Sequence, residues 1–203
     1  MIIYAKRRKK MKNKIRNICD LILGLLVLTV TFIGYYGQWE YLGEYCFISG
    51  IIIGLIFLSS FIYRIKTGKS FYVWVYACCS ISTILIFIAT LVLGLNLKGA
   101  FIFIHIVDPI LILAYWIIFC DHTSLKSHKG IFTVLLWPAF YLILSEILVL
   151  INGNCAFPAS LVLTEHSTLV TLGLVLAVLA AFLLFGCIYH FGNRLIRSKV
   201  LKK

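Results

Sequence analysis

The chain has 203 residues, of which 62% are hydrophobic and 13% are charged, and its mean hydropathy is +1.04. A soluble domain is typically about 45–50% apolar and about a quarter charged, and a chain of this size cannot hide such an excess in one core. The composition therefore excludes a soluble globular protein and a disordered one. The remaining class is a polytopic membrane protein, in which each crossing helix takes about 20 residues.

Six long apolar stretches, taken in chain order, predict six transmembrane helices. Each is close to the roughly 17–25 residues of a spanning helix, and the short connections leave no room for a soluble domain. The stretches cover residues 18–36, 45–63, 72–94, 100–120, 131–152 and 168–191. We therefore expect an all-α six-helix bundle over 18–191, flanked by a basic N-terminal segment (1–17) and a basic tail (192–203).

The basic residues fall almost entirely on one side of these predicted helices. The chain has 19 Lys and Arg residues and a net charge of +12. Eighteen of the 19 lie in the N-terminal segment, in loops 64–71 and 121–130 and in the tail, whereas loop 95–99 holds one. The positive-inside rule then places both termini in the cytoplasm of a multi-pass plasma-membrane protein. Because anionic lipid of the inner leaflet explains the basic segments, we expect membrane lipids, and no nucleic acid, as partners.

The seven cysteines form no CxxC pair, and most lie in or beside apolar stretches, where a free cysteine behaves as a small hydrophobic residue. Cys46 and Cys155 both fall near the predicted outer face, and a disulfide between them is one hypothesis. Asp121, His122 and His128 are loosely spaced, as solvated loop residues are. We therefore expect no metal site and no cofactor.

Three ionisable residues interrupt the predicted helices at one depth in the outer half of the membrane. At 1.5 Å per residue, His105 lies about 8 Å and Asp108 about 12 Å below the outer boundary, and Glu146 lies about 9 Å deep on the next helix. An ionisable group inside the bilayer is costly and is a functional candidate by default. Asp20, at the inner start of the first helix, is better explained by interfacial pairing with neighbouring basic residues such as Arg16.

These residues predict a polar pocket that opens toward the outer leaflet. His105 and Asp108 are three residues apart and share a helical face. Pro109 removes the hydrogen bond to the carbonyl of His105, so the helix should kink there. The following helix adds Tyr141 and Ser145 on one face. The alternative is that these polar side chains only hydrogen-bond neighbouring helices.

A nucleophile for this histidine is available at the outer start of the second predicted helix. Cys46 and Ser49 are three residues apart and lie at or just above the depth of His105. A thiol or hydroxyl beside a general base, with a third group that orients the base, is the arrangement that nucleophilic catalysis requires. The alternative for Cys46 is a small apolar residue at a helix start.

The stretch His105–Pro109, followed by Trp116 and Phe119, resembles the H-x3-P-x6-W-x2-F pattern of a bacterial family of six-span membrane proteins. That family is related to the androgen-induced and androgen-dependent TFPI-regulating proteins. Pro138–Tyr141 resembles the P-x-x-Y of the family's fifth helix. The resemblance implies a six-helix fold with cytoplasmic termini and places Trp116 and Tyr141 among the pocket residues.

The eukaryotic relatives of this family are intramembrane threonine hydrolases that cleave fatty-acid esters of hydroxy fatty acids. They use a threonine at the outer start of the second helix and a histidine in the fourth, and the resemblance places His105 on that histidine. Alignment of the bacterial T-x-x-S-N pattern on Ser49 puts Cys46 at the threonine position. An alignment one turn earlier puts Gly43 there.

The sequence and the resemblance together favour an intramembrane hydrolase of fatty-acyl esters. In this hypothesis Cys46 or Ser49 attacks the ester carbonyl, His105 transfers the proton, and Asp108 or Glu146 orients the imidazole. A second hypothesis is a non-catalytic protein that binds lipid or scaffolds a partner. A third is a proton-coupled transporter that uses the two carboxyl groups.

Overall fold

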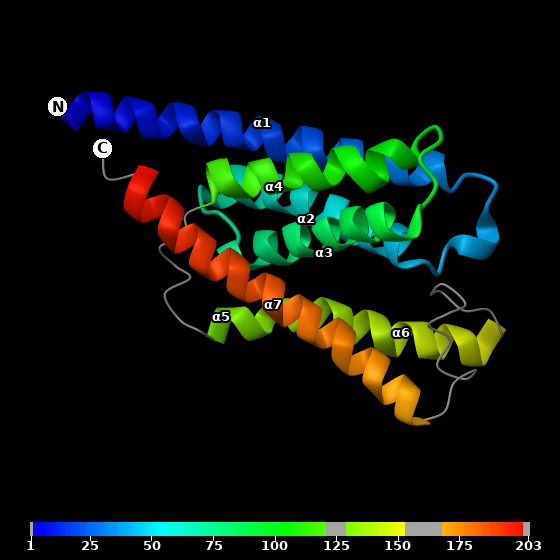
Figure 1. The fold of residues 1–203 in the computed structure, drawn as a ribbon. Helices are drawn as coiled ribbons and strands as arrows, with labels where there is room; N and C mark the ends of the chain where they lie inside the picture. Colours follow the sequence, from blue (N-terminus) through cyan, green and yellow to red (C-terminus); the bar gives the residue numbers. More distant parts are fainter. Residues whose placement is uncertain (1, 121–128, 153–167, 201–203) are drawn as a thin grey trace.

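The structure is a computed structural model that describes residues 2–120, 129–152 and 168–200, and within these ranges it is helical and contains no strand. This confirms the predicted all-α class (Figure 1). The long helices are α1 (Ile2–Gly34), α2 (Tyr45–Thr67), α3 (Val73–Leu93), α4 (Asp108–Phe119), α6 (Leu136–Asn152) and α7 (Thr168–Val200). The short ones are η1 (Trp39–Tyr41), the π-helical turn η2 (Phe103–Val107), α5 (Lys129–Phe132) and η4 (Thr133–Leu135).

Four helices in the described ranges are long and apolar enough to cross a membrane, which indicates a membrane protein. These are Asn13–Gly34 of α1, all of α2, Val73–Val92 of α3 and Val175–Gly192 of α7. The apolar helices Phe103–Phe119 and Thr133–Leu144 are shorter. The first helix also begins far earlier than predicted, because α1 continues through the basic N-terminal segment.

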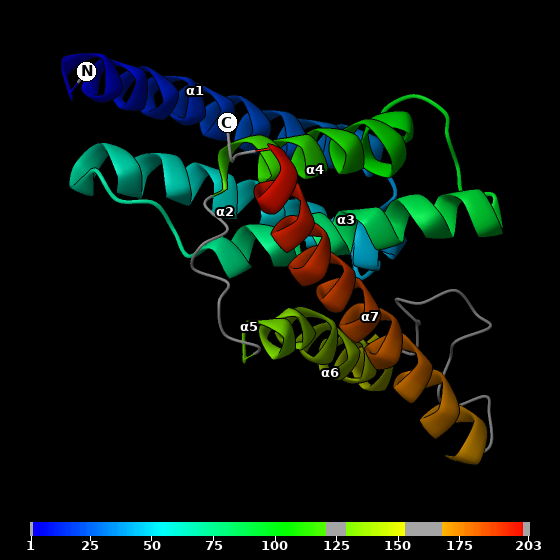
Figure 2. The same cartoon turned by 60° about the vertical axis from the view of Figure 1, so that its left-hand side comes forward.

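The helices α1, α2, α3 and α4 pack against one another, and α7 runs diagonally past α3 and α6 (Figure 1). Figure 2 shows α5 and α6 beneath this group, with α7 crossing beside them. The start of α1 and the end of α7 lie toward the same end of the molecule (Figure 1). We call this end, where α2 ends and α3 begins, the basic end, and we call the opposite end, where α1 ends and α2 begins, the far end.

Glycines allow α1 and α2 to approach closely. A methyl group at Gly54 would lie 2.5 Å from Cγ of Leu28 and 3.2 Å from the backbone oxygen of Gly24. One turn earlier, a methyl group at Gly50 would collide with Oγ1 of Thr31. Small residues at this spacing let helix backbones approach in membranes, where van der Waals contact drives helix association. The glycines at this interface therefore explain how the backbones of α1 and α2 can pack so closely together.

Within the described residues, two apolar cores hold the bundle together. The main core lies along the middle and the basic end, and it includes Phe57, Tyr76, Tyr115 and Trp116, all of them buried. The second core, which we call the far-end cluster, consists of Val30, Tyr35, Phe101 and Ile104, with Leu26, Leu42, Cys46 and Phe47 packed against it. The two cores divide the bundle into the regions where the polar groups described below are found.

Candidate functional site

A cavity of about 320 Å³ lies between α2, α3, η4 and α6 and is partly open to the surroundings of the bundle. Most of its lining is apolar, and its polar groups are few. The lining residues are Ile52, Ile53, Ile56, Trp74, Val75, Cys78, Cys79, Ser82, Thr133, Leu136 and Trp137. A concave, mostly apolar site with a few polar groups is the usual form of a small-molecule site.

The far-end side of this cavity is bordered by hydroxyl groups. The indole Nε1 of Trp137 donates a hydrogen bond to Oγ of Ser49, at 3.1 Å, and Ser49 is fully buried. The hydroxyl of Tyr141 donates to the backbone oxygen of Gly43, at 2.9 Å. The ring of Tyr45 lies between them, with its centroid 6.3 Å from that of Trp137 and 4.9 Å from that of Tyr141. Two predicted site residues, Ser49 and Tyr141, are thus brought together beside the cavity.

His105 is buried in the π-helical turn that precedes α4. Its Nδ1 lies 2.7 Å from the backbone oxygen of Asn96, and its ring centroid lies 5.6 Å from that of Phe101. A hydrogen bond at one ring nitrogen fixes the orientation of the imidazole and the role left to the other nitrogen. If Nδ1 carries the proton and donates to Asn96, Nε2 is the nitrogen that can act as a base.

The turn before Pro109 is a π turn instead of a simple kink. The amide of Asp108 donates to the backbone oxygen of Phe103, five residues earlier, so the hydrogen-bond register is shifted by one residue. Such π bulges occur frequently at functional sites. Asp108 is buried, and its Oδ1 has no hydrogen-bond partner among the described residues. A buried carboxyl oxygen without a partner is costly, which agrees with a functional role for Asp108.

The two candidate nucleophiles face different neighbours. Cys46 packs against the far-end cluster, which contains Phe101 and Ile104, whereas Ser49 binds Trp137 of α6. The contacts of the described residues include none between His105 and either nucleophile. The packing therefore brings Cys46, more than Ser49, toward the chain segment that carries His105.

The other predicted site residues are spread along the bundle. Trp116 is buried in the main core, where its ring centroid lies 4.5 Å from that of Tyr189, about 16 Å along the helix from His105 at 1.5 Å per residue. Ser145 and Glu146 belong to α6, and their side chains lie outside the described part of the structure. The loop residues Asp121, His122, His128 and Cys155 also lie outside the described residues.

Within the described ranges, no group of three or more His, Cys, Asp and Glu side chains could hold a metal ion.

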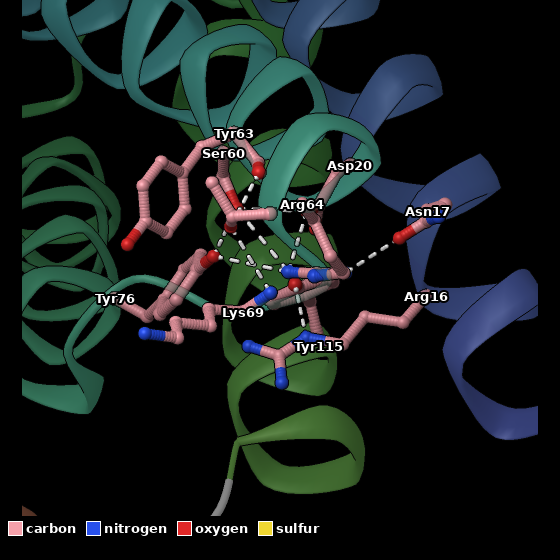
Figure 3. A network of polar contacts seen from close by, with 10 residues as sticks. Arg16, Asn17, Asp20, Ser60, Tyr63, Arg64, Lys69, Tyr76 and Tyr115 are labelled. Carbon is pink, nitrogen blue, oxygen red and sulfur yellow. Dashed lines mark hydrogen bonds and ion pairs between the residues drawn. The ribbon is translucent and has the colours of Figure 1, made fainter. Parts of the chain in front are cut away.

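A polar network at the basic end joins α1, α2 and α3 (Figure 3). Nη2 of Arg64 lies 2.8 Å from Oδ2 of Asp20, and both side chains are buried. Ser60 donates a hydrogen bond to the same carboxylate oxygen, at 2.9 Å, and its hydroxyl also bonds that of Tyr76. Nη1 of Arg64 donates to Oδ1 of Asn17, at 3.2 Å. The ion pair of Asp20 is therefore formed with Arg64 of α2, across the helix interface, and not with the neighbouring basic residues of α1 as expected.

A second arginine extends this network to α4. Nε of Arg16 donates to the hydroxyl of Tyr115, at 2.9 Å. Its guanidinium carbon lies 5.3 Å from the ring centroid of Tyr76 and 5.8 Å from that of Tyr115, within the range of cation–π contacts. Three buried polar atoms of the network have no hydrogen-bond partner in the described part of the chain: Arg16 Nη2, Arg64 Nε and Asp20 Oδ1.

Sequence reasoning missed this network because its members come from four helices. Asp20 and Arg64 each lie near a predicted helix end, where a charged residue needs no special explanation. The one available signal was the spacing of Ser60 and Arg64, which puts a hydroxyl and a cation on one face of the second helix. Trp137 was also missed, since tryptophan in an apolar helix carries no distinguishing pattern.

Comparison of the chain with protein-family models, with curated proteins and with solved structures finds no match.

Proposed function

We propose that the chain is a six-span protein of the plasma membrane, with both termini in the cytoplasm, that binds the acyl chain of a lipid between α2, α3 and α6. The biased distribution of Lys and Arg supports the orientation. The common position of the start of α1 and the end of α7 agrees with an even number of crossings (Figure 1).

The observation that carries the binding proposal is the apolar cavity. A water-sized group takes about 30 Å³, so a cavity of about 320 Å³ has room for roughly ten such groups. Hydrocarbon fits the lining, while Ser82 and the neighbouring hydroxyl of Tyr45 border its far-end side. The hydroxyl of Tyr45 is buried and has no hydrogen-bond partner among the described residues. It is therefore a donor for a polar atom of the bound lipid.

The test uses the whole chain in nanodiscs that contain a phospholipid with a diazirine in its acyl chain. We expect photoadducts on residues of the cavity, such as Ile56 and Cys78, in addition to adducts on lipid-facing positions of α7. Ser82→Phe fills the cavity and should remove the cavity adducts only. Leu91→Phe adds the same ring at an exposed position of the same helix and should leave both sets unchanged.

Adducts confined to the outer surface of the bundle, or cavity adducts that persist in Ser82→Phe, would contradict lipid binding at this place. The adducts on α7 serve as an internal reference in every variant, because most residues of its apolar segment are not buried by the other helices. Poorer contact with the membrane would lower the adducts in the cavity and on α7 alike. The quantity compared between variants is therefore the ratio of cavity adducts to α7 adducts.

A second candidate is acyl-ester hydrolysis, which one observation favours. The contact between Nδ1 of His105 and the backbone oxygen of Asn96 holds the imidazole in one orientation, as a general base requires. In this proposal Nε2 takes the proton of the Cys46 thiol, or of the Ser49 hydroxyl, as the nucleophile attacks the ester carbonyl. The proton then passes to the leaving alcohol, and water releases the acyl group.

A fluorophosphonate and a cysteine-directed acyl probe, applied to native membranes, test this candidate. Labelling at Cys46 or Ser49 should be lost in Cys46→Ala or Ser49→Ala, respectively, and should fall at least about a hundredfold in rate in His105→Ala, the usual size of a general-base contribution. Labelling that is absent, or equally fast in His105→Ala, would exclude the mechanism and leave lipid binding as the function of the site.

A further inference from the structure

The network at the basic end holds more positive than negative charge. Its ionised groups are the guanidinium groups of Arg16 and Arg64 and the carboxylate of Asp20, while its remaining members are neutral hydroxyl and amide groups. Arginine stays charged in proteins, and a buried charge is costly unless it is paired and hydrogen-bonded. Because the ion pair of Asp20 is with Arg64, Arg16 has no ion-pair partner of its own among the described residues.

The guanidinium of Arg16 is held in a fixed position with one edge unused. Its Nε is bonded to Tyr115, and its plane lies near the rings of Tyr76 and Tyr115. Figure 3 shows its terminal nitrogens directed away from Asp20 and Arg64. One of them, Nη2, is buried and has no hydrogen-bond partner among the described residues, and the side chain as a whole is only 8% exposed. The edge that is normally used for a bidentate contact is therefore preorganised and has no partner within the part of the chain that the structure describes.

The position of Arg16 limits what could bind there. The apolar part of α1 begins at Asn13, so Arg16 lies within about one turn of the membrane boundary. The phosphate groups of phospholipids lie at that level, and arginine binds phosphate through two parallel hydrogen bonds. The preceding part of α1 is strongly basic and attracts anions to this end of the bundle.

From these observations we propose that Arg16 binds a phosphate group at the basic end of the bundle, where α1 meets α4. The site is separate from the cavity between α2, α3 and α6 and does not depend on it. The phosphate could belong to an anionic phospholipid of the adjacent leaflet or to free phosphate, because both present the same oxygens to the guanidinium.

The experiment compares the unfolding midpoint of the full chain in nanodiscs of phosphatidylcholine and in nanodiscs that also contain phosphatidylglycerol. A ligand that binds only the folded state raises the midpoint. We expect the wild type to gain stability from phosphatidylglycerol, and Arg16→Gln to lose this gain. Lys14→Gln removes the same charge from an exposed position two residues away and should keep the gain.

Arg16→Lys guards against a variant that does not fold, because it keeps the charge. Lysine lacks the planar fork of arginine, so we expect a gain clearly smaller than that of the wild type. A third set of nanodiscs, of phosphatidylcholine with added inorganic phosphate, is compared with chloride at equal ionic strength. A gain with inorganic phosphate assigns the site to the free ion, and a gain with phosphatidylglycerol alone assigns it to a lipid headgroup.

Two results would overturn the proposal. If neither phosphatidylglycerol nor phosphate stabilises the wild type, the aromatic rings and Tyr115 are sufficient partners for Arg16. If Arg16→Gln and Lys14→Gln change the gain by the same amount, or if Arg16→Lys keeps the full gain of the wild type, the gain arises from general attraction between a basic surface and an anionic one, with no specific site at Arg16.

Discussion

Nη2 of Arg64 lies 2.8 Å from Oδ2 of Asp20, and this ion pair connects α1 to α2 inside the bundle. Ser60 and Tyr76 add hydrogen bonds to the pair, so that α3 is joined to it as well. Breaking a buried pair by removing one partner is far more costly than removing both, because the remaining charge has no compensation. The pair therefore makes the relative position of three helices sensitive to single substitutions.

Asp20→Ala should lower the free energy of unfolding by about 3–5 kcal/mol, since it leaves the buried guanidinium group of Arg64 without its carboxylate. The double variant Asp20→Ala/Arg64→Met should recover most of this loss, because it also removes the charge of Arg64 and keeps a long apolar side chain. Unfolding of the purified chain in mixed micelles measures both. Asn17→Ala is the control, as it removes only the 3.2 Å hydrogen bond to Arg64. A double variant that is less stable than Asp20→Ala would contradict this account.

Gly54→Ala should destabilise the contact between α1 and α2. The added methyl group would lie 2.5 Å from Cγ of Leu28 and 3.2 Å from the backbone oxygen of Gly24, so the helices must separate or Leu28 must change rotamer. Overpacking of this kind typically costs about 1–3 kcal/mol. Gly173→Ala is the matched control, because among the described residues no atom outside its own helix backbone lies within 4 Å of the new methyl group. Equal unfolding midpoints for the two variants would show that α1 and α2 can adjust without cost.

His105→Leu should loosen the segment between α3 and α4. The substitution removes the contact of Nδ1 with the backbone oxygen of Asn96, and a hydrogen bond of this kind contributes about 0.5–1.5 kcal/mol. We expect amide hydrogen exchange at residues 95–100 to accelerate by roughly twofold to tenfold. Exchange in α2 should stay unchanged. Phe103→Leu, in the same turn but exposed, is the control; exchange that is equally fast in wild type and His105→Leu would mean that the loop is held by other contacts.

Glu44 should make the stability of the chain depend on pH. Burial raises the pKa of its carboxyl above the ordinary value of 4.5, although the hydrogen bond donated by Tyr35, at 2.8 Å, opposes the shift. Between the ordinary and the raised pKa the folded chain binds more protons than the unfolded chain, so the free energy of unfolding falls as the pH rises through this window. Glu44→Gln should abolish this slope.

The measurement is the unfolding midpoint in a series of buffers that begins below the ordinary pKa of Glu44. Tyr35→Phe should extend the falling part of the curve to higher pH, since it removes a hydrogen bond that favours the charged carboxylate. Glu40→Gln, at an exposed position of the same loop, should leave the slope as in the wild type. A slope that survives in Glu44→Gln must come from another group.

The helices and their class could be predicted because long apolar stretches and short connections leave few other structures. The helix boundaries were less accurate: α1 extends through the basic segment, and α5, η4 and α6 divide the fifth apolar stretch. Hydropathy does not predict these boundaries. A helix such as α1 can continue from an apolar segment into a charged one, because adding a residue to an existing helix is easier than starting a new helix.

The neighbours of the candidate site could not be read from the sequence. The contact of Ser49 with Trp137, and that of Asp20 with Arg64, depends on which helices lie side by side and how each is rotated. Cys46 and Ser49 both lie at the start of α2, as their spacing predicted. Their side chains nevertheless point in different directions around the helix axis. Cys46 therefore meets the far-end cluster, and Ser49 meets α6.

The π turn of residues Phe103–Val107 has one more consequence, for how α4 tolerates changes in length. A π turn accommodates one residue more than an α-helical path would need, and each residue of a helix corresponds to about 100° of rotation. Deletion of a single residue in this turn would let the helix continue as a regular α-helix while Asp108, Tyr115 and Trp116 keep their present directions. Deletion of one residue within α4 itself would instead rotate the residues on one side of the deletion by about 100° relative to those on the other. The side chains of one of the two parts would then no longer face the core. The segment before Pro109 is therefore the one place in this helix where the chain could have gained or lost a residue without refolding the bundle.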